Sequence, residues 1–291
     1  MRIGFHMPFS GNLEKLKQKI HISRGNTFQV YARSLRGVDK EGNPHSLQRL
    51  NQKKLKELHA FLDEKNIKPV VVHAPYFYNL AQEKNVNKAL EEINHAQLMM
   101  EDLEWATKIE APFYILQPGY YKKKHPVLAI EEVKSQLFSI LEETEWTGDI
   151  LIKNMAGAGT EIGSTLEEWN ELISFHPRVK GALDLARIYA SGYDFTSEKD
   201  AHDFYLEIEE KVGWEKIHVL YINDSNRGCG SKKNNFVPLG EGSIGFYGYE
   251  YLLKYTELQN KIWIVENQPK PSYYDESIKF LTAFYQDKRG E

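Results

Sequence analysis

Short runs of apolar residues alternate along this chain with longer stretches in which apolar positions recur every three or four residues. The short runs have the length and the β-branched content of buried strands, and the longer stretches have the period of amphipathic helices. The pattern predicts eight strands, over residues 2–5, 27–31, 69–73, 113–116, 150–153, 180–184, 218–223 and 261–266. It also predicts helices between them, including residues 47–66, 87–109, 129–144, 166–175, 199–212 and 274–286.

This regular alternation of strands and helices is typical of a parallel sheet, because parallel neighbours need a long crossover connection. Eight such units in 291 residues fit one closed barrel rather than two domains. We therefore predict an α/β protein with a (β/α)8 TIM barrel fold, formed as a single domain over residues 1–291. In such a barrel the functional site is built from the loops at the carboxyl ends of the strands.

Composition agrees with a globular protein, since 41% of the residues are hydrophobic and 27% are charged. No apolar run is long enough to span a bilayer, and the apolar segment at the start is too short for a signal peptide. We expect a soluble, cytoplasmic monomer without membrane contact. Cys229 is the one cysteine and allows no internal disulfide. The net charge of -4 argues against indiscriminate binding to polyanions, so local clusters of cations must decide that question.

Polar residues stand at or just after the ends of the predicted strands, where the mouth of a barrel would lie. For any one of these residues, the simpler interpretation is that the side chain caps a strand or hydrogen-bonds a loop. Together, in one ring, they favour a binding site. The ring comprises His6, Arg36, His73, Gln117, Lys153, Asp184, Asn223, Asp224 and Glu266.

Several of these positions belong to longer motifs, and the motifs resemble those of the endonuclease IV family in order and spacing over nearly the whole chain. Members of that family are apurinic/apyrimidinic endonucleases on a (β/α)8 barrel; they bind three zinc ions, bend DNA and flip the abasic nucleotide out of the helix. The resemblance therefore implies a role in DNA repair. The motifs are Gly4-Phe5-His6-Met7, Val72-His73-Ala74-Pro75-Tyr76-Phe77, Leu116-Gln117-Pro118-Gly119, Ile152-Lys153-Asn154-Met155-Ala156-Gly157, Asp184 with Ala190-Ser191-Gly192-Tyr193-Asp194, Asn223-Asp224 and Leu239-Gly240-Glu241-Gly242-Ser243-Ile244-Gly245.

The chain departs from that family at its metal-ligand positions. Of nine implied ligand positions, three keep a suitable residue, namely His73, Asp184 and Glu266. Lys153 replaces a glutamate that bridges two metals in the family, and an ammonium group has no lone pair to offer a cation. We therefore predict a pocket without metal or other cofactor, a case of metal-site loss. The six changed positions carry Gln117, Lys153, Arg187, Tyr221, Asn234 and Phe236.

Lys153, Asp184 and Glu266 are the candidate catalytic residues. If the two carboxylates converge as the resemblance implies, they can pair with the lysine, because buried charges require partners. Arg187 could act similarly where a metal has been lost. A salt-bridge cluster that only orders the barrel mouth is an equally good interpretation. Without metal, neither cation can generate a hydroxide nucleophile, so the chain would be a pseudoenzyme.

The parts that grip DNA are better preserved than the metal site. In the family an arginine after the second strand and an aromatic with its apolar neighbour after the third strand enter the duplex; Arg36, Tyr76 and Phe77 match them. The alternative is that both aromatics only pack the loop. We expect double-stranded DNA, abasic or distorted, as the partner. Cations on strand-end loops that form a plausible phosphate track are Arg33, Lys122, Lys123, Lys124, Arg187, Arg227, Lys232 and Lys233, although a lysine run is also a common solvated surface.

Three hypotheses follow. The first is a DNA-binding protein with little or no nuclease activity. The second is an abasic-site lyase in which Lys153 forms a Schiff base with the sugar aldehyde, and the third is a sugar isomerase or epimerase. The third ranks lowest, because Lys153 and Tyr221 spoil the carboxylate-rich ligand set that such enzymes use for their metal.

Overall fold

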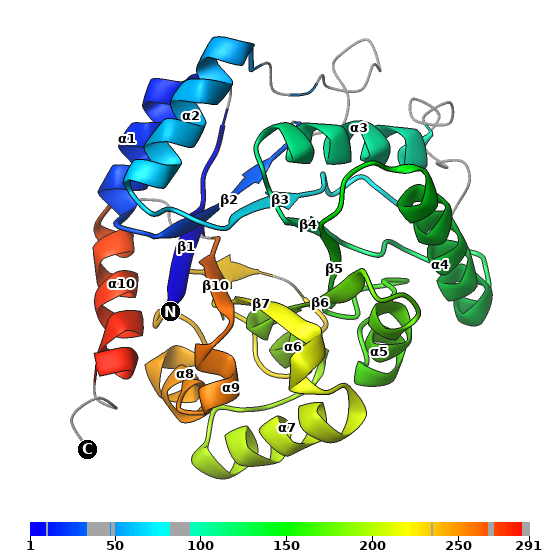
Figure 1. Cartoon of the computed structure of the whole chain (residues 1–291). Coiled ribbons are helices and arrows are strands. Elements are labelled where there is room, and N and C mark those ends of the chain that lie inside the picture. Colours follow the sequence, from blue (N-terminus) through cyan, green and yellow to red (C-terminus); the bar gives the residue numbers. More distant parts are fainter. Residues whose placement is uncertain are drawn as a thin grey trace.

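The structure, a computed structural model, describes residues 1–9, 11–33, 47, 50–81, 94–233, 235–266 and 271–286. Eight parallel strands close into a barrel in the order β1-β10-β7-β6-β5-β4-β3-β2. Figure 1 shows these strands at the centre with the helices arranged around them. The barrel strands are β1 (Arg2–His6), β2 (Thr27–Tyr31), β3 (Val70–His73), β4 (Phe113–Leu116), β5 (Asp149–Lys153), β6 (Val179–Asp184), β7 (Ile217–Tyr221) and β10 (Ile262–Val265).

The predicted (β/α)8 barrel is confirmed, and all eight predicted strands are present with small shifts at their ends. They were recognisable because parallel strands that are covered on both faces are continuous apolar runs. A short antiparallel pair, β8 (Asp224–Ser225) with β9 (Phe236–Val237), lies in the loop region after β7 and was not predicted.

The outer layer consists of helices whose ends are set largely by side-chain caps. The helix predicted to start at residue 47 begins instead at Gln52, because the Asn51 side chain accepts a hydrogen bond from the backbone N–H of Lys54. The helices are α1 (Leu13–Ser23), α2 (Gln52–Glu64), α3 (His95–Lys108), α4 (Pro126–Glu143), α5 (Leu166–Ser174), α6 (Leu185–Ser191), α7 (Glu198–Lys211), the 3-10 turn η1 (Trp214–Lys216), α8 (Gly245–Leu253), α9 (Thr256–Gln259) and α10 (Pro271–Gln286).

The barrel interior is filled by a small apolar cluster, separate from the larger core between strands and helices. Its members point inward from six strands: Val71, Ile115, Leu151, Ala182, Val219, Tyr221 and Ile264. Because successive side chains of a strand alternate between its faces, the residues two positions further on also point inward. The apolar cluster is therefore the floor beneath the carboxyl-end mouth.

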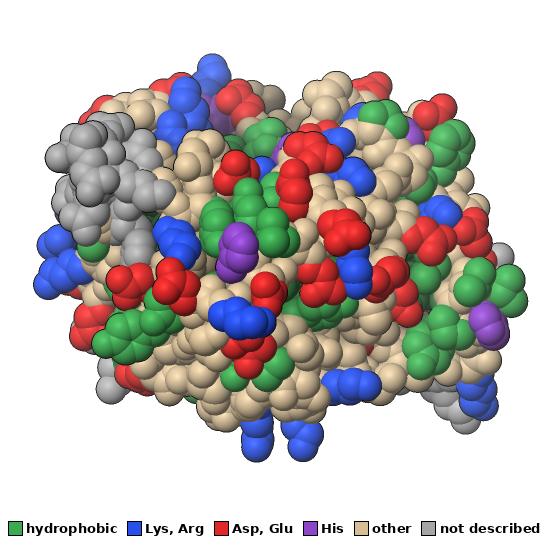
Figure 2. All heavy atoms as spheres, turned by 90° about the horizontal axis from the view of Figure 1, so that it is seen from below, with side chains coloured by type: hydrophobic (Ala, Val, Ile, Leu, Met, Phe, Trp, Pro, Cys, Tyr) green, Lys and Arg blue, Asp and Glu red, His purple; other side chains and the backbone are tan. Residues whose placement is uncertain are grey.

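The side of the barrel that α7 covers carries acidic and basic side chains interspersed with one another (Figure 2). Lys211 pairs with Glu167 at 2.7 Å, and Lys254 pairs with Glu198 at 2.9 Å. Exposed pairs of this kind contribute little to stability. Among the described residues, no helix is both long and apolar enough to cross a membrane.

Candidate functional site at the barrel mouth

Polar side chains form a layer directly above the apolar floor of the barrel. His73, Lys153 and Asp184 each follow a floor residue of their own strand by two positions, and Glu266 follows Ile264 in the same way. Strand alternation therefore turns all four side chains into the mouth. His73, Lys153 and Asp184 are fully buried there.

The Lys153 ammonium lies at the centre of this layer. Its Nζ is 3.0 Å from Oδ2 of Asp184 and 2.8 Å from Oε2 of Glu266, and it lies 3.4 Å from the centre of the Tyr221 ring. The expected convergence of these two carboxylates on Lys153 is therefore present. A cation held by two carboxylates and an aromatic face is well compensated for its burial.

The Glu266 carboxylate accepts further hydrogen bonds that sequence reasoning did not find. Gln29 Nε2 donates to its Oε1 at 3.1 Å, and Asn223 Nδ2 donates to its Oε2 at 3.2 Å. Burial alone would raise the pKa of Glu266, but the charge of Lys153 and the hydrogen bonds from Lys153 and Gln29 outweigh it and hold that pKa far below its usual range. Gln29 is also the acceptor for the Tyr221 hydroxyl. The one feature of the sequence that marks Gln29 is that it is a polar residue within a buried strand.

Asp184 is also the N-cap residue of α6. Its Oδ1 accepts from the backbone N–H of Arg187 at 3.2 Å, while its Oδ2 lies 3.6 Å from Arg187 Nε. The Arg187 side chain is buried and extends to Met155, whose Sδ accepts from Nη1 at 2.8 Å. Arg187 therefore lies inside the mouth and not on an outer surface.

The residues of the mouth do not fit the zinc centre that the family resemblance implies. His73 Nδ1 lies 2.6 Å from the carbonyl oxygen of Ala74, and burial together with Lys153 lowers the pKa of His73 to about 3. The neutral imidazole of His73 could ligate a metal ion, but the oxygens of Asp184 and Glu266 face the ammonium group of Lys153. Within the described part of the chain, no three His, Cys, Asp or Glu residues come together as a metal site would require.

Three buried polar atoms in this region make no hydrogen bond to any of the residues that the structure describes: His73 Nε2, Gln117 Nε2 and Arg187 Nε. A buried polar group without a partner costs free energy, and most such groups in folded proteins are satisfied. His73 Nε2 and Gln117 Nε2 are therefore polar groups of the mouth without a hydrogen bond among the described residues, whereas Arg187 Nε still lies 3.6 Å from the Asp184 carboxylate.

The candidate DNA-contacting aromatics follow β3 directly. Tyr76 is 38% exposed, and its hydroxyl accepts from the Tyr31 hydroxyl at 2.8 Å. Phe77 is partly buried, and its ring centre lies 4.8 Å from that of Tyr78. Tyr76 is thus partly exposed at the rim of the mouth, where its ring lies 5.5 Å from that of His73, whereas Phe77 packs against Tyr78 and against His95 of α3.

The candidate cations are distributed between surface and interior. Lys122, Lys123, Arg227 and Lys232 are exposed on the loops that follow β4 and β7. Arg36 and the ligand-position residue Asn234 lie outside the described residues. The prediction that Arg33 belongs to a phosphate track is wrong: Arg33 is 2% exposed and forms ion pairs with Asp102 at 2.7 Å and Glu101 at 3.0 Å.

The glycine-rich segment 239–245 is shaped by one buried carboxylate, that of Asp224. Five backbone N–H groups donate to it, from Ser225, Gly240, Gly242, Ile244 and Gly245, at 2.8–3.1 Å. A Cβ at Gly242 would come within 2.2 Å of Asp224 Oδ1, and Gly240 and Gly245 adopt positive φ. The glycines are therefore required by the loop geometry.

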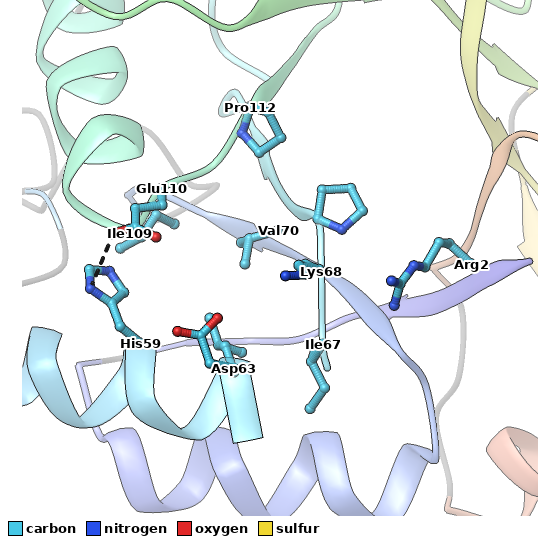
Figure 3. Close-up of a pocket in the computed structure, with 11 residues that line it drawn as sticks. Arg2, His59, Asp63, Ile67, Lys68, Val70, Ile109, Glu110 and Pro112 are labelled. Carbon is cyan, nitrogen blue, oxygen red and sulfur yellow. Dashed lines mark ion pairs between the residues drawn. The ribbon is translucent and has the colours of Figure 1, made fainter. Parts of the chain in front are cut away.

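A cavity of about 360 Å³ opens at the opposite, amino end of the strands, between α2, β3 and the α3–β4 connection (Figure 3). Several of its polar side chains contact the protein: Arg2 donates to the carbonyl oxygen of Asn66 at 2.9 Å, and His59 lies 3.6 Å from Glu110. In barrels of this class the amino end serves stability rather than function. The candidate functional site is accordingly the mouth around Lys153.

Fold and site define a (β/α)8 barrel whose polar groups converge at the carboxyl-end mouth. Residues 27–284 match the xylose isomerase-like TIM barrel family. The chain is 32% identical over 283 residues to the probable endonuclease 4 of Carboxydothermus hydrogenoformans, covering 96% of this chain and 95% of that protein. It is 28% identical to the probable endonuclease 4 of Clostridium beijerinckii, covering 99% of this chain and all of that one.

The fold agrees with this similarity in sequence. The crystal structure of endonuclease IV from Thermus thermophilus superposes with a TM-score of 0.81 at 23% identity, covering 99% of this chain and 100% of that one. The chain belongs to the endonuclease IV family.

Proposed function

We propose that this chain is an endonuclease IV relative that binds double-stranded DNA, at abasic or distorted sites, and has lost the zinc centre and with it most or all strand incision. The observation that carries the proposal is the Lys153 ammonium, 2.8 Å from Glu266 and 3.0 Å from Asp184. It occupies the position at which the family resemblance implies a metal-bridging glutamate.

The loss of incision follows from the chemistry of this position. In metal-dependent hydrolases the ion lowers the pKa of bound water to about 7 and stabilises the attacking and leaving oxygens. A lysine can stabilise an anion but cannot generate hydroxide. The retained carboxylates are already engaged as well, since Glu266 accepts hydrogen bonds from Gln29, Lys153 and Asn223.

DNA binding is supported by what remains on the same end of the barrel. Tyr76 presents an exposed aromatic ring after β3, and the exposed cations Lys122, Lys123, Arg227 and Lys232 lie on loops of the mouth. Aromatic side chains that enter a base step and cations that contact phosphates are the usual means of gripping a bent duplex. We further propose that the protein is a single-domain monomer of the cytoplasm.

The test is fluorescence anisotropy with matched abasic and intact duplexes at several salt concentrations, alongside an incision assay on the abasic duplex. We expect salt-dependent binding, tighter to the abasic duplex, without cleavage. The absence of salt-dependent binding to either duplex would reject the DNA-binding role, and robust incision by protein with stoichiometric zinc would reject the loss of the metal centre.

The lyase alternative finds less support in the geometry. A Schiff base requires an accessible neutral amine, whereas Lys153 is fully buried and its Nζ contacts two carboxylates. Borohydride trapping on an abasic duplex decides the matter: a covalent adduct that Lys153→Ala abolishes would establish the lyase. The isomerase alternative requires a metal held by carboxylates, and the engaged carboxylates of the mouth disfavour it.

A further inference from the structure

A fully buried carboxylate on α3, that of Asp102, lies outside the site described above. Its Oδ1 accepts from Arg33 Nε at 2.7 Å. Its Oδ2 accepts from two phenol groups, those of Tyr78 and Tyr114, each at 2.8 Å. Burial raises the pKa of Asp102, while the charge of Arg33 and the three hydrogen bonds oppose that rise. Charged groups are buried to this degree only where they are held by several partners.

The partners of Asp102 come from three neighbouring parts of the barrel. Arg33 lies two residues beyond the end of β2, Tyr78 lies in the loop after β3, and Tyr114 lies within β4. Arg33 is also tied to α3 itself, donating through Nη2 to the carbonyl oxygen of Leu98 at 3.2 Å. The Asp102 side chain thus joins the end of β2 and the β3 loop to α3 and β4.

The β3 loop is pinned on both sides of its tip. Before the tip, the backbone N–H of Ala74 donates to Ile115 at 2.8 Å. After it, Tyr78 is held by Asp102, and Asn79 is held by the backbone of Tyr120 through two bonds of 3.1 Å. The tip between these anchors carries Tyr76, the exposed aromatic.

We infer that Asp102 is a positioning residue for DNA recognition: through Tyr78 it fixes the β3 loop that carries the Tyr76 ring, and so limits the freedom of that ring. This inference rests on the proposed function for its ligand, but its structural part stands on the network alone. A held aromatic loses little conformational freedom on association, so loosening the loop reduces affinity even when Tyr76 itself is unchanged.

The chain provides a matched pair of variants. Tyr78→Phe and Tyr114→Phe each remove one hydroxyl that donates 2.8 Å to the same oxygen of Asp102, and both rings are buried. A merely structural network would respond equally to the two changes. Positioning predicts that Tyr78→Phe weakens binding to an abasic duplex by roughly tenfold, whereas Tyr114→Phe changes it less than about twofold, at similar losses of stability.

Hydrogen exchange of residues 74–81 supplies a readout that does not depend on DNA. We expect faster exchange there in Tyr78→Phe and near-unchanged exchange in Tyr114→Phe. Equal changes in the two variants, in exchange or in affinity, would overturn the positioning role. If the unmodified protein binds no duplex, the proposed function fails, and the exchange comparison still decides whether Asp102 orders the loop.

Discussion

Replacing Lys153 by methionine tests whether the mouth is held together by the ion pairs described above. At an effective dielectric constant near 20, two unit charges about 3 Å apart attract by roughly 5–6 kcal/mol before desolvation is counted. Lys153 makes two such contacts, at 2.8 and 3.0 Å. Methionine has a similar length and no charge, so the variant leaves the buried Glu266 carboxylate without a cation and Asp184 with only the longer contact to Arg187.

We expect Lys153→Met to lower the free energy of unfolding by about 3–5 kcal/mol, as removal of one partner from a buried ion pair does. Adding Glu266→Gln should recover part of this loss, because Glu266 then carries no charge, while Asp184 keeps its ion pair with Arg187. Lys134→Met is the matched control: Lys134 also contacts two carboxylates, of Glu131 and Glu171, but these are more than 40% exposed, and we expect a loss of at most about 1 kcal/mol.

Urea denaturation at pH 7, followed by tryptophan fluorescence and circular dichroism, measures all three variants. A Lys153→Met protein within about 1 kcal/mol of the unmodified chain would refute the reasoning, because the cluster would then contribute no net electrostatic stabilisation. A double variant, Lys153→Met with Glu266→Gln, that is as unstable as the single one would show that packing, and not charge, is responsible.

Three further predictions concern pH, loop geometry and metal. Burial lowers the pKa of His95 to about 4, and its Nδ1 accepts a hydrogen bond from the backbone N–H of Asn79. Between pH 6.5 and 4, His95 is therefore neutral in the folded state but protonated in the unfolded chain. Stability from this group is complete above about pH 6.5 and falls by roughly 2 kcal/mol by pH 5; His95→Asn should flatten that part of a denaturation profile, and an unaltered slope would contradict the assignment. Gly242→Ala should cost about 2 kcal/mol or more, since its Cβ would meet Asp224 at 2.2 Å, whereas Gly159→Ala, with open space around it, reports only backbone strain; equal losses would speak against the steric argument. Dialysis against EDTA should leave duplex affinity and melting temperature unchanged, and elemental analysis should find substoichiometric zinc; a melting temperature that drops on chelation would point to a structural metal.

The sequence predicted the fold well because its signals are local. Each strand is an apolar run of four to six residues in the structure, and the run is visible without knowledge of its neighbours. Helix starts were less accurate where a cap decides them, as at Asn51. Helix α1, capped by the Asn12 side chain, was not among the predicted helices.

The site was only partly predictable, because its contacts join residues far apart in the chain. Lys153 was expected to pair with Asp184 and Glu266 through the family resemblance, and the distances agree. Gln29, which reaches Glu266 across 237 positions, gave no local signal of that contact. Arg33 was assigned to the surface by its charge alone, and its buried partner Asp102 lies on a helix that no local pattern connects to it.

The five amide donors gathered by Asp224 have an energetic consequence for recognition. Glycine-rich segments are normally expensive to order, since they forfeit the most backbone entropy when they adopt one shape. Here that backbone entropy is lost during folding, so segment 239–245 already has one conformation before any partner binds. Binding would then carry no further entropic penalty for ordering this segment.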